Sequence, residues 1–286
     1  MKLRISIFLL TLVARLPLGV LYVISDFIGF VLHHVIGYRR RIVRQNLVSS
    51  FPDKSLDEIK VIEKRYYRFV SDVMVETVKL LHISDTEMKR RVEVLDYDIV
   101  NREVEKGRPV VIMLGHYGNW EWVQEMAIYF PDVCKGSIYH TMNSKLWDDI
   151  FLKMRGRWGN VLLPQKQAPR FLLNRGNLPW IFGFIADQRP KGASKQGHTM
   201  FLNHDTAFIT GPEEIGTRMG AAFVYLDIER PERGHYIIRF KNINPMEDGE
   251  PYPYTRRFWE EFEHTINRNA ALWLWSHNRW SYRRKK

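Results

Sequence analysis

Between residues 109 and 243 the chain alternates short apolar runs with amphipathic segments, and this alternation constrains the fold more than any other feature. The apolar runs are bounded by glycine or proline, which is typical of buried strands, at 109–114, 135–140, 160–164, 178–188, 221–230 and 235–243. Helical spacing or end signals predict helices at 55–82, 121–130, 145–159, 168–176, 211–220 and 253–275. The alternation predicts an α/β fold with a central, mostly parallel sheet flanked by helices.

The amino terminus is strongly apolar. From Ile5 to Gly37 the only formal charges are Arg15 and Asp26, which leaves three apolar stretches that are each shorter than the roughly 20 residues of a membrane span. Pro17 either kinks a helix or begins a second one. The pattern favours a membrane anchor, either one span or a bent embedded segment, over a soluble core hairpin or a cleaved signal. We therefore divide the chain into an anchoring helical segment, 1–38, and one compact domain, 39–286.

The net charge of +11 predicts a negatively charged partner: nucleic acid, an anionic membrane face or an acidic carrier protein. Four arginines follow the apolar segment directly, which favours the cytoplasmic side of a membrane and contact with its head groups: Arg39, Arg40, Arg41 and Arg44. Cys134 is the only cysteine, so the chain forms no internal disulfide, which fits a reducing compartment.

The stretch GHYGNWEW, residues 115–122, follows the first predicted buried strand. Reactive groups in α/β sheets gather at the carboxyl ends of strands, and His116 lies at such a position. Gly118 permits a tight turn, and Asn119 is suited to cap the next helix. Glu121 would then lie in the first helical turn, where it can hold one imidazole nitrogen and make the other a better base.

A His and a Glu five residues apart also occur by chance, so taken alone this pair is more often structural than catalytic. Other chemistries have less support. The sequence has no HExxH metal motif, no GxSxG nucleophile motif and no GxxxxGK[ST] phosphate loop, which disfavours a metal site, a serine nucleophile and nucleotide hydrolysis.

GHYGNWE resembles the His-x4-Asp/Glu signature of membrane glycerolipid acyltransferases. The surrounding blocks resemble the bacterial lipid A biosynthesis acyltransferase family, in the family's order and over nearly the whole chain. These blocks are RRRIVRQNLVSSFP with the acid Glu76 on the following helix, the block with Tyr139, Asn143 and Arg155, IADQRPKG, TMFLNHDTAFITG and LWLWSHNRW.

The resemblance implies acyl transfer from acyl carrier protein to a hydroxyl of a lipid A precursor. His116 would be the general base, assisted by Glu121, with no covalent acyl-enzyme. The donor thioester is a co-substrate, and neither a cofactor nor a metal is expected. Arg155 is the predicted oxyanion donor, with the backbone of Gly118 and Asn119 as the alternative.

The resemblance also makes the end of the strand at 178–188 part of the site. Asp187, Gln188 and Arg189 have a plain interpretation as a polar turn with a salt bridge, but they become candidates to line the site. Arg189 and Lys191 would meet the phosphates of the acceptor. Trp273, Trp275, His277 and Trp280 are interpreted as core or membrane-rim residues, and His277 is not predicted to be catalytic.

The expected partners are acyl carrier protein, anionic inner-membrane lipid and a phosphorylated glycolipid acceptor, without nucleic acid. The expected location is the cytoplasmic face of a bacterial inner membrane. Two alternatives remain: the same chemistry on an aminolipid, a lysophospholipid or a mannosylated phosphoinositide, and a non-enzymatic binder of nucleic acid or anionic lipid. The chain departs from the family in lacking a proline before its final Trp block and in being somewhat short, which leaves the acceptor less determined than the chemistry.

Overall fold

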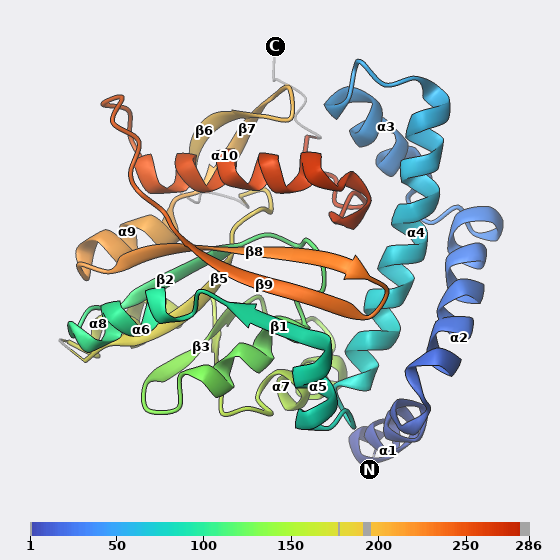
Figure 1. Ribbon diagram of the computed structural model, residues 1–286, viewed down its shortest axis with the longest axis horizontal. Helices are drawn as coiled ribbons and strands as arrows, with labels where there is room; N and C mark the ends of the chain where they lie inside the picture. The colour runs from blue at the N-terminus through green and yellow to red at the C-terminus, as the bar shows by residue number, and fades with distance from the viewer. Residues whose placement is uncertain (1, 177, 191–195, 281–286) are drawn as a thin grey trace.

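The computed structural model describes residues 2–176, 178–190 and 196–280, and these form an α/β fold around a seven-stranded sheet (Figure 1). The order of the strands across the sheet is β1 (Val92–Leu95), β9 (His235–Asn242), β8 (Ala222–Glu232), β2 (Val110–Leu114), β5 (Trp180–Ile185), β3 (Cys134–Tyr139) and β4 (Val161–Pro164). Five adjacent strands, from β8 to β4, are mutually parallel, whereas β9 runs antiparallel to β8. The predicted α/β fold with a mostly parallel sheet is confirmed.

Helices cover the sheet and its ends. Figure 1 shows α10 (Pro253–Arg268) above the sheet, and α5 (Asp85–Arg91) and α7 (Lys145–Arg155) below it. The remaining helices of this part are α6 (Asp98–Glu105), α8 (Ala168–Leu173), α9 (Gly211–Arg218) and two 3-10 segments, η2 (Trp122–Tyr129) and η3 (Ala270–Leu272). A separate antiparallel pair, β6 (Gln196–Phe201) and β7 (His204–Ile209), completes the fold.

Two predicted helices differ from the structure. The predicted helix over 121–130 is a 3-10 segment, η2. The predicted final helix over 253–275 ends at Arg268, because Asn269 adopts an extended backbone with φ −153°. The chain beyond Asn269 forms η3 and then runs back beside the loop after β2, where Tyr117 and Trp273 form an isolated bridge.

The amino-terminal helices pack against the domain. The helices α1 (Lys2–Arg15) and α2 (Leu18–Phe30) are followed by a short π-helix, η1 (Val31–Val35), and then by α3 (Arg40–Ser50) and α4 (Leu56–Lys79). Pro17 precedes α2, so it begins a second helix, which was one of the two predictions for this residue. Figure 1 shows α2 along the outer side of α4, away from the sheet.

One face of α2 is buried against α4, and the other is exposed and apolar. The buried face consists of Leu18, Leu21, Ser25 and Gly29. A Cβ at Gly29 would lie 3.3 Å from both Ser71 Oγ and the Tyr67 carbonyl oxygen, so only glycine permits this close helix approach without adjustment. Leu18–Val35 is long and apolar enough to cross a membrane. Because one face of α2 is occupied by α4, only its other face is available to lipid.

The predicted membrane-facing arginines make intramolecular contacts. Arg39 Nη1 donates to the carbonyl oxygen of Ser276 at 3.0 Å, and Arg40 and Arg44 both bind the buried carboxylate of Glu63. These three side chains therefore join α3 to α4 and to the carboxyl-terminal segment. Arg41 is exposed.

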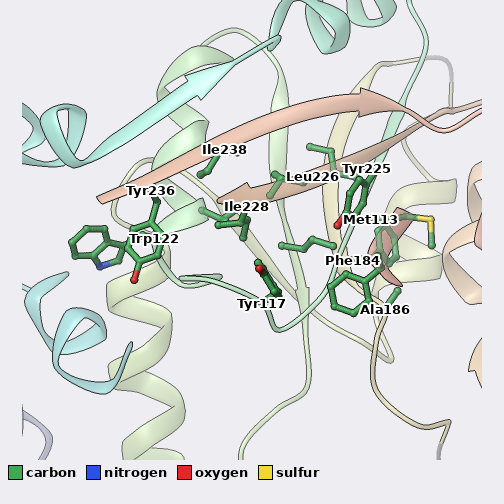
Figure 2. Close-up of a cluster of buried hydrophobic side chains, with 14 of the residues drawn as sticks. Met113, Tyr117, Trp122, Phe184, Ala186, Tyr225, Leu226, Ile228, Tyr236 and Ile238 are labelled. Carbon is green, nitrogen blue, oxygen red and sulfur yellow. The ribbon is translucent and has the colours of Figure 1, made fainter. Parts of the chain in front are cut away.

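The hydrophobic core continues up to the carboxyl ends of the strands. Figure 2 shows a cluster of buried side chains from β2, β5, β8 and β9 around the loop that follows β2: Met113, Tyr117, Trp122, Phe184, Ala186, Tyr225, Leu226, Ile228, Tyr236 and Ile238. Tyr117 and Trp122 lie within the predicted catalytic stretch, on either side of Gly118–Glu121, and are each no more than 2% exposed. The loop is thus anchored in the core at both ends.

Candidate active site

The loop after β2 adopts a turn that requires glycine at position 118. Gly118 has φ +57°, and a Cβ at this position would lie 2.5 Å from Ile228 Cγ2 of β8. The same residue donates its backbone N–H to the carbonyl oxygen of Leu272 at 3.0 Å. Positive φ and close packing both exclude a larger side chain here, so the loop holds His116 in a fixed position above the sheet.

His116 forms a hydrogen-bonded pair with Asp187. The distance between His116 Nδ1 and Asp187 Oδ1 is 2.6 Å. Asp187 Oδ2 also accepts the backbone N–H of His116 at 3.0 Å and the indole N–H of Trp273 at 2.8 Å. The carboxylate therefore has three donors, which fix its orientation toward the imidazole.

The sheet register explains this pair. Strands β2 and β5 are parallel neighbours, with Leu114 opposite Ile185. His116 and Asp187 each lie two residues beyond these positions, just after the strands end. The parallel strands therefore place both side chains at the same edge of the sheet. The contact is therefore a consequence of pairing β2 with β5.

The environment keeps Asp187 ionised. Its side chain is 3% exposed, and burial alone would raise the carboxyl pKa. The electrostatic interaction with His116 and the hydrogen bonds from His116 and Trp273 outweigh burial, so the pKa of Asp187 lies below its ordinary value. An ionised Asp187 places the proton of His116 on Nδ1.

This tautomer leaves the lone pair of His116 on Nε2, the nitrogen that a base would use. Nε2 lies 3.4 Å from Gln188 Nε2, and 17% of the His116 side chain is exposed. The ring of Trp120 contacts the imidazole edge-on, with 5.3 Å between the centroids. The predicted placement of Gln188 beside the site agrees with this geometry.

Glu121 does not hold the imidazole. Its two carboxylate oxygens accept from Arg155 Nε and Nη2 at 2.8 and 2.6 Å. The predicted His116–Glu121 pair is wrong, because the register brings Asp187 to His116 and α7 brings Arg155 to Glu121. A bidentate guanidinium–carboxylate pair is among the strongest polar contacts in proteins. It raises the pKa of Arg155 despite burial and ties α7 to the loop.

Asn119 connects the loop to α4. Its Oδ1 accepts the backbone N–H groups of Glu121 and Trp122 at 3.1 and 3.0 Å, which is the capping contact that the sequence predicts. Its Nδ2 donates to Glu76 Oε2 at 2.7 Å. Glu76 is fully buried and also accepts the hydroxyl groups of Tyr22 and Tyr236.

The carboxyl-terminal segment supplies contacts that sequence reasoning did not assign to the site. Besides the bond from Trp273 to Asp187, Leu274 donates its backbone N–H to the carbonyl oxygen of His116 at 3.1 Å. Trp273 and Trp275 are buried, so they are core residues and not a membrane rim. Burial lowers the pKa of the neighbouring His277 to about 4, so this imidazole is neutral at pH 7.

Three predicted site residues remain: Gly118, Arg189 and Lys191. The backbone N–H of Gly118 is engaged by Leu272 and is not available to an oxyanion. Arg189 directly follows Gln188 and has its own interactions. Lys191 lies outside the described residues. Within the described parts of the chain, no three His, Cys, Asp or Glu side chains are arranged to hold a metal ion.

Comparison with known proteins agrees with the blocks identified in the sequence. The sequence model for the bacterial lipid A biosynthesis acyltransferases matches residues 3–282, which includes the amino-terminal helices, the His116 loop and the carboxyl-terminal segment. The search against curated proteins gives no match. The chain belongs to the bacterial lipid A biosynthesis acyltransferase family.

Proposed function

We propose that the chain transfers a fatty acyl group from the thioester of acyl carrier protein to a hydroxyl group of a lipid A precursor. The observation that carries this proposal is the pair of the partly exposed His116 with the buried Asp187, in which Nδ1 and not Nε2 contacts the carboxylate, at the carboxyl edge of the sheet. Family membership supports an acyltransferase over a non-enzymatic binder.

The reaction requires one base and no covalent intermediate. Nε2 of His116 removes the proton from the acceptor hydroxyl, and the hydroxyl oxygen attacks the thioester carbonyl carbon. The tetrahedral intermediate breaks its C–S bond, and the imidazolium returns the proton to the leaving thiolate. Asp187 stabilises the imidazolium that forms between these steps.

Arg155 remains our candidate for the oxyanion donor. Its contact with Glu121 uses Nε and Nη2, and we assign the Nη1 edge to the developing negative charge. In this mechanism Glu121 positions Arg155, and its role is separate from that of the base. No cofactor is required, because the thioester already carries an activated acyl group.

We infer that the enzyme works at the cytoplasmic face of a bacterial inner membrane, with anionic lipid around the outer face of α2. Its net charge of +11 favours an acidic carrier protein and a phosphorylated acceptor. Family membership and charge complementarity are the grounds on which we propose these partners.

A transfer assay tests the function directly. Purified enzyme is supplied with acyl carrier proteins loaded with chains of different lengths, and with a lipid A precursor, an aminolipid, a lysophospholipid or a mannosylated phosphoinositide. We expect one further acyl chain on the lipid A precursor and almost none with His116→Ala. Acylation of another acceptor in place of the lipid A precursor would contradict the proposed substrate and leave the chemistry intact.

A further inference from the structure

A cavity with several charged residues in its lining lies between α4 and the β8–β9 hairpin, with a volume of about 280 Å³. Figure 1 shows the turn of this hairpin reaching the middle of α4, on the same end of the sheet as the loop after β2. Six charged residues contribute to its lining: Arg65, Arg68 and Asp72 from α4, and Arg230, Glu232 and Arg233 from the hairpin.

Two carboxylates hold three of these arginines in place. Asp72 is 1% exposed and accepts from Arg230 Nη2 at 2.6 Å and from Arg233 Nη2 at 2.5 Å. Asp26, on α2, accepts from Arg233 at 2.8 Å and from Arg68 at 3.1 Å. The guanidinium groups are thus ordered before any ligand arrives, which lowers the entropic cost of binding.

The acidic groups around the cavity bind three of its four arginines. Asp26 and Asp72 hold Arg68, Arg230 and Arg233, and Glu76 lies 4.0 Å from Arg230. Arg65 is exposed and forms no ion pair with any residue in the described parts of the chain. An anionic group bound in the cavity would supply the acceptor that Arg65 lacks.

The cavity shares a wall with the catalytic loop. Leu272 of η3 lines the cavity, and its carbonyl oxygen accepts the backbone N–H of Gly118. The carbonyl oxygen of Asn269, also in the lining, accepts the hydroxyl of Tyr117 at 3.2 Å. Tyr117 and Gly118 are the two residues after His116, so a ligand in the cavity lies just behind the loop that carries the base.

The arginine cluster also contacts α2, because Asp26 accepts hydrogen bonds from Arg68 and Arg233. Asp26 belongs to α2, whose outer face exposes Val23 and Phe27. A lipid whose chains contact this outer face would place its head group near the arginine cluster. A phosphate group suits guanidinium groups better than it suits ammonium groups, because each guanidinium offers paired donors.

We propose that this cavity binds a phosphate group of a lipid. In the reaction proposed above, on which this assignment rests, the phosphate belongs to the acceptor, and the cavity positions the glycolipid relative to His116. The site is distinct from the expected phosphate contacts of Arg189 and Lys191. The same chemistry would recognise the head group of a neighbouring anionic phospholipid, so the test separates these two sources.

Binding is measured on full-length His116→Ala protein in nonionic detergent micelles, so that the result does not depend on turnover. Three probes are incorporated in the micelles: a phosphorylated lipid A precursor, the same lipid after enzymatic removal of its phosphates, and phosphatidylglycerol. Each is titrated against the parent protein and three further variants, Arg65→Glu, Glu232→Gln and Arg218→Glu. Arg218 lies in a separate hollow beside Arg108 and Gly220 and is the matched control for charge reversal.

We expect removal of the phosphates or Arg65→Glu to weaken binding of the precursor about tenfold. Glu232→Gln should tighten binding about twofold, because it removes a negative charge from the cavity, and Arg218→Glu should have little effect. An equal effect of Arg65→Glu on phosphatidylglycerol supports the site and assigns it to phospholipid. Equal effects of Arg65→Glu and Arg218→Glu, or no effect of phosphate removal, overturn the proposal.

Failure of the site and failure of the proposed function give different results. If wild-type protein transfers no acyl group but the binding differences persist, the phosphate site stands without the reaction. If transfer proceeds and Arg65→Glu changes neither binding nor the KM for the acceptor, the function stands without this site.

Discussion

At the scale of single residues, Asp187 orients the base of the proposed reaction. Asp187→Asn keeps the shape but removes the charge that places the His116 proton on Nδ1, and the amide can stabilise the wrong tautomer. We expect kcat to fall by about 10²–10⁴ with little change in the KM for either substrate. Steady-state kinetics with the melting temperature as a control for folding checks this. Wild-type kcat in Asp187→Asn would contradict the assigned pair.

Glu121 is expected to act through Arg155. Glu121→Gln leaves the guanidinium without its bidentate carboxylate, and removing one partner of a largely buried ion pair costs about 3 kcal/mol. We therefore expect Glu121→Gln to reduce both activity and the free energy of unfolding. Asp187→Asn should reduce mainly activity. Urea unfolding followed by tryptophan fluorescence, run beside the kinetic assay, separates the two roles. A Glu121→Gln protein of unchanged stability and much reduced kcat would favour direct catalysis by this residue.

Glu125 gives the stability of the fold a dependence on pH. Both of its carboxylate oxygens are buried without a hydrogen-bond partner, and burial raises its pKa to about 7. The Glu125 carboxyl group ionises near pH 4.5 in the unfolded chain and only near pH 7 in the folded chain, so unfolding releases a proton between these values. The free energy of unfolding should therefore fall as pH rises from about 4.5 to 7, by roughly 3 kcal/mol.

Glu125→Gln should remove this loss. Its free energy of unfolding should match that of the wild type near pH 4.5 and exceed it near pH 8, as measured by urea unfolding at each pH. The exposed Glu105→Gln is the control for removal of one negative charge. A constant difference between Glu125→Gln and the wild type across this range would rule out the linkage.

At the scale of elements, α3 acts on the site through the carboxyl-terminal segment. Asn46 Nδ2 donates to the carbonyl oxygens of Trp275 and His277 at 2.9 and 3.0 Å, and this segment carries Trp273 to Asp187. Asn46→Ala should cost about 1–2 kcal/mol in the free energy of unfolding and lower kcat more than it changes KM. Gln45→Ala, on the exposed side of the same helix, is the control and should change neither quantity.

The predicted and observed strands show what the sequence could and could not predict. Most main-sheet strands were predicted because each is an apolar run bounded by turn residues. The short β1, with the pattern VEVL, and the hairpin of β6 and β7 were missed, since neither has a continuous apolar run. The pairing of His116 with Asp187 depends on β2 lying beside β5. Strand order is set by packing between distant segments, and the nearby Glu121 therefore gave a misleading local signal.

At the scale of the whole molecule, α2, α4 and the loop after β2 lie at one end of the sheet, beside the turn of the β8–β9 hairpin (Figure 1). Glu76 joins these parts, because it accepts hydrogen bonds from Tyr22 of α2, Asn119 of the loop after β2 and Tyr236 of β9. Burial raises the pKa of Glu76. This arrangement predicts that α2 contributes both to membrane contact and to the order of the site.

The two faces of α2 should therefore respond differently to substitution. Phe27 is 68% exposed, and Phe27→Glu removes an apolar side chain whose burial in lipid contributes about 2 kcal/mol. Cosedimentation with anionic vesicles should show at least tenfold weaker binding and an unchanged melting temperature. Leu21 is fully buried against α4, so Leu21→Ala should cost about 2–5 kcal/mol in the free energy of unfolding and, by loosening Tyr22 and Glu76, lower kcat. Vesicle binding that is insensitive to Phe27→Glu would show that membrane contact is made elsewhere on the molecule.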